Sequence, residues 1–249
     1  GINVRTLQNE LSHVRSMLRE MGRASIADAP ELSNRALGVS GGSRIGKKSA
    51  MTQGGYHAAR QRAVSVGREG MASLLRLEIE LGLRGNEALH ARSDTLARWL
   101  HEIITSNRIL VLDGTKGGRQ RFVTIRDKDN ALDAIREAQI IAGKQGGFLL
   151  VRSDGSPAGG LKEARQIYHS WMSRARVTPH SARYAWAQRN YLLLINSGFK
   201  EREALLTIAI ELGHGSGRAR WVKSTYLREL PKDLTTEQLV ALLRKMVWN

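Results

Sequence analysis

Four short motifs in this sequence carry arginine, lysine, histidine and tyrosine side chains that could serve one reaction centre. Guanidinium and ammonium groups bind anions such as phosphate, imidazole moves protons near neutral pH, and a phenol can act as a nucleophile. Taken singly, each motif has an ordinary explanation, such as an i,i+3 ion pair, an exposed turn lysine or a core tyrosine. The motifs are Gly82-Leu83-Arg84-Gly85-Asn86-Glu87, Lys116, His180-Ser181-Ala182-Arg183, and Leu212-Gly213-His214 followed by Tyr226.

The charge balance indicates a polyanionic partner. The 249 residues include 39 Lys and Arg against 23 Asp and Glu, a formal net charge of +16. A solvated basic surface is the alternative, but an excess of this size favours nucleic acid, because each cation on a phosphate releases counterions. With only 5 Trp, 5 Tyr and 3 Phe, base stacking on single strands is disfavoured, and duplex DNA is the better guess.

The composition also excludes several classes of protein. Without cysteine, the chain has no disulfide scaffold, no thiol nucleophile and no zinc site of the cysteine type. Its longest apolar runs are too short to span a membrane, so we expect a soluble intracellular protein. The stretch around Gly41, Gly46 and Lys47 has P-loop spacing, but Lys48 stands where the magnesium-binding hydroxyl belongs, and no P-loop is predicted.

The elements that must position the motifs are mainly helical. Leu7, Leu11, Val14 and Leu18 recur at helical spacing and predict an amphipathic helix over 4–20. Similar patterns predict further helices. One region covers 56–81 and has a break at 66–70. Others cover 129–142, 160–175, 201–211 and 218–230, and the last covers 236–247 and follows a capping box of Thr235 and Gln238.

Two further local patterns concern the motifs directly. Thr178 as N-cap and Pro179 at the first helical position predict a helix that carries His180 and Arg183. The β-rich runs 109–112 and 121–125 flank a glycine-containing turn and predict a hairpin with Lys116 at its tip. The expected fold class is therefore mainly α with a small antiparallel β-sheet (α+β).

In their order along the chain, the motifs resemble the tyrosine recombinase, or phage integrase, family. The resemblance covers about Leu74 to Leu227 and rests on Arg-x-x-Glu, a hairpin lysine, His-x-x-Arg, Leu-Gly-His and a late tyrosine. It implies a DNA breaking-rejoining catalytic domain over 49–249. Residues 1–48 are then expected to be the C-terminal part of a helical core-binding domain plus a Gly/Ser-rich linker, so that the sequence begins inside that domain.

The resemblance implies a role for each motif. Arg84 and Arg183 would clamp the scissile phosphate, since guanidinium forks bind phosphate oxygens bidentately and stay charged. Lys116 would protonate the departing 5′ oxygen as general acid. Tyr226 would attack the phosphorus and leave a 3′-phosphotyrosyl bond.

The remaining roles follow from the same resemblance. His180 and His214 match the two histidine positions, one assisting proton transfer and the other hydrogen-bonding the phosphate. Glu87 would hold the arginine–histidine cluster in place. Tyr184 and Tyr191 also lie nearby, but they precede Leu-Gly-His and the family order rejects them as nucleophiles.

The resemblance also bears on cofactors and partners. Exchange of a phosphodiester for a phosphotyrosine conserves bond energy, so we expect no ATP. Arginines and a lysine would supply the positive charge that metal ions provide in many nucleases, so we expect no metal and no other cofactor. The expected partner is duplex DNA held between two lobes. Residues expected to touch its phosphates are Arg44, Lys47, Lys48, Arg119, Arg218, Arg220 and Lys223.

The assembly is expected to be a homo-tetramer on paired DNA sites, with a monomer or dimer when free. In the family, a terminal helix like the one with Leu239, Leu242, Leu243 and Val247 docks into a neighbouring protomer; packing on its own core is the alternative. The sequence thus predicts a site-specific recombinase or integrase of a mobile element, in the bacterial cytoplasm with the nucleoid. The alternatives are a type IB topoisomerase-like enzyme and a catalytically inactive DNA-binding accessory protein.

Overall fold

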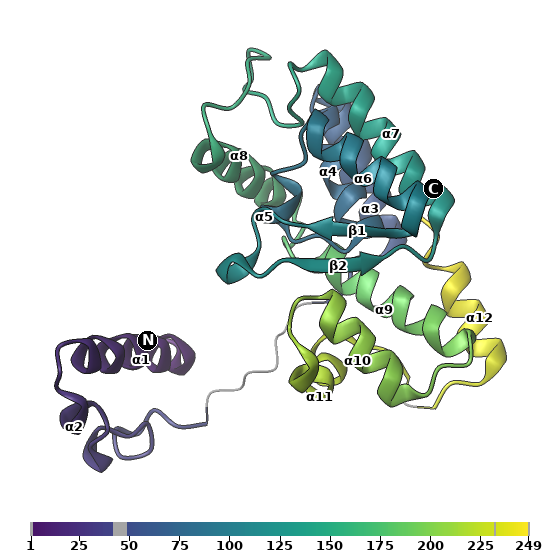
Figure 1. Cartoon of the computed structure of the whole chain (residues 1–249). Helices are drawn as coiled ribbons and strands as arrows, with labels where there is room; N and C mark the ends of the chain where they lie inside the picture. Colours follow the sequence, from purple (N-terminus) through teal and green to yellow (C-terminus); the bar gives the residue numbers. More distant parts are fainter. Residues whose placement is uncertain (1, 42–48, 232, 249) are drawn as a thin grey trace. The chain divides into compact units, whose positions relative to one another are not determined.

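The computed structural model describes residues 2–41, 49–231 and 233–248 (Figure 1). Internal contacts separate the chain into two units, residues 1–47 and residues 48–249, and each is described by itself. Among the described residues, no helix has the length and apolar character needed to cross a membrane.

The first unit is a small helical segment. The helix predicted over 4–20 is confirmed as α1 (Val4–Glu20), and α2 (Ala24–Ala27) and the 3₁₀ turn η1 (Pro30–Leu32) follow it. The chain then returns along α1, where Gln8 Nε2 donates to the carbonyl of Val39 over 2.7 Å and Arg15 donates to Asn34 over 2.9 Å. No side chain of α1 is buried, so its apolar face stays partly exposed within this unit.

The second unit confirms the predicted fold class, because it is helical apart from one two-stranded antiparallel sheet in its described part. Its helices are α3 (Gln53–Ser65), α4 (Glu69–Leu81), α5 (Gly85–Ala88), α6 (Ser93–Ser106), α7 (Lys128–Lys144), α8 (Leu161–Arg174), α9 (Ser181–Asn196), α10 (Glu201–Glu211), α11 (Ala219–Tyr226) and α12 (Thr236–Arg244), with a 3₁₀ turn η3 (Ser216–Arg218) before α11.

Helix α4 forms the centre of the core. It packs against α3, α7 and α9 (Figure 1). Most of its side chains are buried. Two of the buried groups are glutamate side chains with partners: Glu78 accepts from the hydroxyl of Tyr168 over 2.7 Å, and Glu80 accepts from Arg189 over 2.7 Å. Buried polar groups need such partners, and these two tie α4 to α8 and α9.

The helix ends at Gly82, whose left-handed φ of 64° closes its last turn. A Cβ at this position would lie 2.5 Å from the ring of Trp186, so the close approach to α9 requires a glycine. The carbonyl of Gly82 thereby points toward the motifs that the sequence singles out.

The hairpin predicted around Lys116 is confirmed. Strand β1 (Arg108–Val111) pairs antiparallel with β2 (Arg121–Thr124), and the loop between them contains a 3₁₀ turn, η2 (Lys116–Gly118). Ile109 and Val111 on β1 and Val123 on β2 are buried, and Arg121 is buried with them. The period of two therefore places one charged side chain on the apolar face of the sheet.

Two predicted helix boundaries close to the motifs are wrong. Helix α9 begins at Ser181, not at Pro179, because the backbone N–H and the hydroxyl of Ser181 both donate to the carbonyl of Thr178 and close a turn. His180 is consequently the N-cap residue rather than a residue on the helical face of Arg183. Helix α11 ends at Tyr226, four residues before the predicted end.

The C-terminal segment packs on its own chain. The capping box of Thr235 and Gln238 is confirmed at the start of α12, which ends at Arg244 rather than 247. Leu239 is buried, and Trp248 is 1% exposed with its ring edge-on to Tyr56 at 5.4 Å. Of the other residues of the apolar stripe, Leu242 and Leu243 are half-buried and Val247 is exposed, so the single chain covers the stripe only in part.

Candidate active site

Three arginines surround one buried carboxylate and are called the arginine cluster here: Arg84, Arg121 and Arg183. Glu87 accepts from Arg84 Nη1 over 2.6 Å and from both Nη atoms of Arg121 over 2.5 and 2.7 Å. Arg183 lies at an ion-pair distance of 3.7 Å from the same carboxylate. Glu87 also accepts from the backbone N–H of Arg84, which closes the first turn of α5. One carboxylate thus fixes three cations from three elements.

Two helix C-termini supply the other acceptors of the cluster. Arg183 donates to the carbonyl of Gly82, after α4, over 2.5 Å and also to that of Leu212, after α10. Arg84 donates to the same Leu212 carbonyl over 2.8 Å. The last carbonyls of a helix have no partner within it and carry partial negative charge, so they suit guanidinium donors.

The arginine cluster and Glu87 together carry a net positive charge although they are largely buried. Burial by itself would raise the pKa of Glu87, but the hydrogen bond and charge of Arg121 and the charges of the other two arginines lower it below its ordinary value. Burial and the charge of Arg121 lower the pKa of Arg183 to about 9. With Glu87 ionised, one negative charge faces three guanidinium groups. Nε of Arg183 is buried and finds no acceptor among the described residues.

The next pair joins α10 to α11. His214 follows the end of α10, and its Nε2 lies 3.1 Å from the hydroxyl of Tyr226, the last residue of α11. Burial and then the charges of Arg183, Arg84 and Arg121 lower the pKa of His214 to about 3. The imidazole is therefore neutral near pH 7, with a proton on one of its two ring nitrogens.

Aromatic rings fix the position of the phenol. Tyr226 is 6% exposed, with the ring of Tyr184 at 4.3 Å and that of Trp221 at 5.6 Å. Trp221 also meets His214 edge-on at 4.7 Å. Such contacts hold the rings of Tyr226 and His214 in one orientation relative to the arginine cluster.

Lys116 and His180 share a cavity with Arg84. This cavity is lined by all three residues, together with the basic side chains Arg165 and His169. Lys116 is exposed in the hairpin loop, and His180 is half-buried at the start of α9. Arg84 borders this cavity and also donates to the carbonyl of Leu212, two residues before His214. It therefore links the cavity with Lys116 and His180 to the pair of His214 and Tyr226.

The residues expected to touch DNA phosphates are placed differently from one another. Arg119, Arg218 and Arg220 are exposed. Lys223 is exposed as well but forms an ion pair with Glu201. Arg44, Lys47 and Lys48 lie outside the described residues. Over the same described part of the chain, no group of three His, Asp or Glu side chains could hold a metal ion.

Arg121 is the site residue that sequence reasoning missed. Its side chain is 3% exposed, and beyond Glu87 it donates from Nε to the carbonyl of Glu211 over 2.7 Å. The available signal was the alternation of the strand, since Arg121 shares the face of Val123. A cation on the buried face of a strand must have a buried partner.

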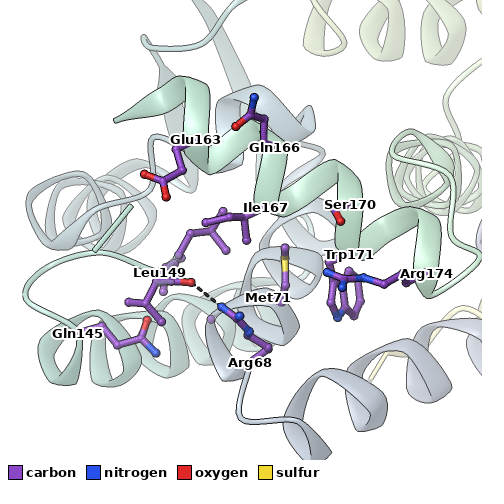
Figure 2. Close-up of a pocket in the computed structure, with 13 residues that line it drawn as sticks. Arg68, Met71, Gln145, Leu149, Glu163, Gln166, Ile167, Ser170, Trp171 and Arg174 are labelled. Atoms are coloured by element: carbon purple, nitrogen blue, oxygen red, sulfur yellow. Dashed lines mark hydrogen bonds between the residues drawn. The ribbon is translucent and has the colours of Figure 1, made fainter. Parts of the chain in front are cut away.

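A second cavity lies apart from these residues (Figure 2). It is formed by the start of α4, the segment after α7, and α8, and its walls include Met71, Leu149 and Trp171. Arg68 donates to the carbonyl of Val151 over 2.5 Å at its edge. None of the six residues with an expected catalytic role lines this cavity.

Comparisons with known proteins concern the family and the fold. No curated protein matches the chain. A solved structure titled "Crystal structure of XerA recombinase" aligns over 98% of this chain and 83% of that chain, with 16% sequence identity and a TM-score of 0.44. A family model described as "Integrase" matches residues 38–189, a stretch that contains Arg84, Lys116, His180 and Arg183 and stops before His214 and Tyr226. Since this match covers more than half of the 249 residues, the chain belongs to the integrase family.

Proposed function

We propose that this integrase-family chain is a site-specific DNA recombinase that cuts and rejoins duplex DNA through a 3′-phosphotyrosyl intermediate, without metal or ATP. The observation that carries the proposal is the hydrogen bond of 3.1 Å between the phenol of Tyr226 and a neutral His214 beside the arginine cluster. A nucleophile, a proton acceptor and positive charge for a phosphate are thus side by side.

The arginine cluster would bind the scissile phosphate. Arg84 and Arg183 come from different elements and meet at the carbonyl of Leu212, so a phosphate at this point could take donors from both. The buried Nε of Arg183 offers a donor that no acceptor in the described part of the chain uses. Guanidinium groups fixed before the substrate arrives stabilise the extra negative charge of the pentacoordinate transition state without rearranging.

The chemical step then involves the remaining residues. The oxygen of Tyr226 forms a bond to phosphorus while its proton passes toward Nε2 of His214. The phosphate charge offsets the arginines that suppress the basicity of this imidazole. The bond from phosphorus to the 5′ oxygen breaks, and that oxygen takes a proton from Lys116. The products are a 3′-phosphotyrosyl strand and a free 5′-hydroxyl, and attack by a 5′-hydroxyl of another duplex reverses every step.

Binding to the duplex would use the basic surface. Arg119, Arg218 and Arg220 are exposed, and the net charge of +16 supports sequence-independent attraction to phosphates. We further propose that residues 1–48 are part of a core-binding domain that contacts the same DNA. Homo-tetramers on paired sites, in which the C-terminal segment reaches a neighbour, belong to the same proposal.

A nicked suicide duplex tests the proposal. Such a substrate loses a short fragment after cleavage, so the covalent protein–DNA adduct accumulates and is read on a denaturing gel. We expect an adduct with the unchanged protein and none with Tyr226→Phe, which removes only the hydroxyl. Tight binding without any adduct would instead identify an accessory DNA-binding protein, and relaxation of supercoils without strand exchange would identify a topoisomerase.

A further inference from the structure

The loop that carries Lys116 rests on α5 at one point. Asn86, the second residue of α5, donates from Nδ2 to the carbonyl of Gly114 over 2.7 Å. The backbones also meet there, because a Cβ at Gly114 would lie 2.4 Å from the carbonyl oxygen of Asn86. Gly114 has a φ of +71°, which is another reason for a glycine at this position. The loop is thus joined to α5 two residues before Lys116.

The amide of Asn86 is itself held in one orientation. Nε of Arg165, on α8, donates to Oδ1 of Asn86 over 2.6 Å. Because Oδ1 accepts this bond, the amide nitrogen is the atom that faces Gly114. Arg165, Asn86 and Gly114 line the same cavity as Lys116, Arg84 and His180.

Helix α5 therefore connects the arginine cluster to the loop that carries Lys116. Arg84 precedes the helix and Glu87 fixes the arginine cluster, while Asn86 between them holds the lysine loop. We propose that Asn86 is a positioning residue that sets the place of the Lys116 ammonium relative to the arginine-bound phosphate. This rests on the proposed function, in which Lys116 is the general acid for the departing 5′ oxygen.

The loop needs such a restraint. Lys116 is exposed, and the three glycines of the loop, at 114, 117 and 118, all have positive φ. A general acid works only when its proton comes within hydrogen-bond reach of the leaving oxygen. Misplacement of a catalytic group by about 1 Å can cost about 100-fold in rate. Loss of the Asn86 bond should therefore slow cleavage by roughly 10- to 100-fold.

A substrate with sulfur in place of the 5′-bridging oxygen distinguishes positioning of the acid from general damage. A thiolate leaves without protonation, so a defect in the general acid disappears with this substrate, whereas a defect in phosphate binding or in the nucleophile remains. Adduct formation is measured with the oxygen and sulfur duplexes for the unchanged protein, Lys116→Ala and Asn86→Ala. We expect both variants to be slow with oxygen and near the unchanged protein's rate with sulfur.

Matched variants sharpen the test. Asn86→Asp keeps an acceptor for Arg165 but loses the donor to Gly114, so we expect it to behave like Asn86→Ala. Asn196→Asp makes the same change at the exposed end of α9 and should keep the full rate with both substrates. Thermal unfolding of each variant establishes that it is folded.

The outcomes separate the two levels of the proposal. If Lys116→Ala is restored by sulfur but Asn86→Ala is fast with oxygen, or equally slow with both, the role of Asn86 is refuted while the mechanism stands. Full activity of Asn86→Asp with oxygen refutes the importance of the Gly114 bond. If no protein forms an adduct with either substrate, the proposed function itself fails.

Discussion

Nε2 of His214 lies 3.1 Å from the hydroxyl oxygen of Tyr226, although 12 residues separate the two along the chain. The 3₁₀ turn η3 and the first seven residues of α11 lie between them, and Trp221 of α11 packs against both rings. The same His214 is kept neutral by burial and by the arginine cluster. Thus ring packing fixes where the phenol of Tyr226 lies, and burial together with the arginine charges keeps His214 unprotonated.

The carboxylate of Glu87 should be the largest single contributor to the stability of the site. Glu87→Gln leaves three guanidinium groups without a buried counter-charge, and we expect a loss of about 3–5 kcal/mol in the free energy of unfolding. Urea denaturation measures this directly. Asp133→Asn is the matched control, because its ion pair with Arg136 is more than half exposed. It should cost less than about 1 kcal/mol, and equal losses in the two variants would contradict the assigned role of Glu87.

Gly82 should tolerate no side chain. Gly82→Ala meets the ring of Trp186 and also strains a residue with a φ of +64°. Gly198→Ala is a control for strain alone, since φ there is +86° and nothing lies within 4 Å of its Cβ. We expect Gly198→Ala to cost about 1–2 kcal/mol and Gly82→Ala to cost a further 1–3 kcal/mol, roughly, measured by thermal or urea unfolding. Similar losses at both positions would argue against the close packing of α4 on α9.

The buried Glu78 should make stability fall as pH rises. Burial, opposed by the hydrogen bond from Tyr168, raises the pKa of Glu78 from 4.5 to about 8. Between these values the unfolded chain has released the proton and the folded chain still holds it, so raising the pH favours unfolding. The expected loss across this window is on the order of a few kcal/mol. The lowered pKa of His214 has the opposite effect below about pH 6.5, so urea denaturation from pH 6.5 to 8 should show this slope. Glu78→Gln should flatten it; an unchanged slope in the variant would exclude Glu78 as the cause.

Much of the secondary structure could be predicted because it depends on local patterns. The spacing of Leu7, Leu11, Val14 and Leu18 defines α1, and the turn glycines define the hairpin. Where prediction fails, tertiary contacts decide. No glycine or proline stops α11 before Pro231, yet the helix ends at Tyr226, whose carbonyl accepts from the side chain of Gln188 over 3.0 Å.

The residue types of the site could be predicted from the sequence, but their hydrogen-bond and ion-pair partners could not. The family order selects Arg84 and Arg183, and the structure brings both to the carbonyl of Leu212. Arg121 belongs to no predicted motif, because its partners Glu87 and Glu211 are 34 and 90 residues away along the chain. Contacts over such separations are decided by packing, which spacing in the sequence does not encode.

Two basic residues near the site should differ in their effect on DNA binding. Arg218 is exposed, whereas Lys223 is already paired with Glu201. If Arg218 contacts a phosphate, Arg218→Ala should reduce the slope of log affinity against log salt by about 0.9, and Lys223→Ala should change it less. Titration of a fluorescent duplex at several salt concentrations measures both slopes. A larger change in slope for Lys223→Ala than for Arg218→Ala would show that Lys223, and not Arg218, contacts the phosphate.

The central claim is that the phenol of Tyr226 attacks the phosphorus, and identification of the attached residue tests it most directly. The adduct formed on a nicked duplex is digested with nuclease and protease, and mass spectrometry locates the tyrosine that keeps a 3′-nucleotide. The account predicts the modification on Tyr226 alone, even though the ring of Tyr184 lies only 4.3 Å away. A nucleotide on Tyr184 or any other residue, or an adduct that persists in Tyr226→Phe, would contradict it.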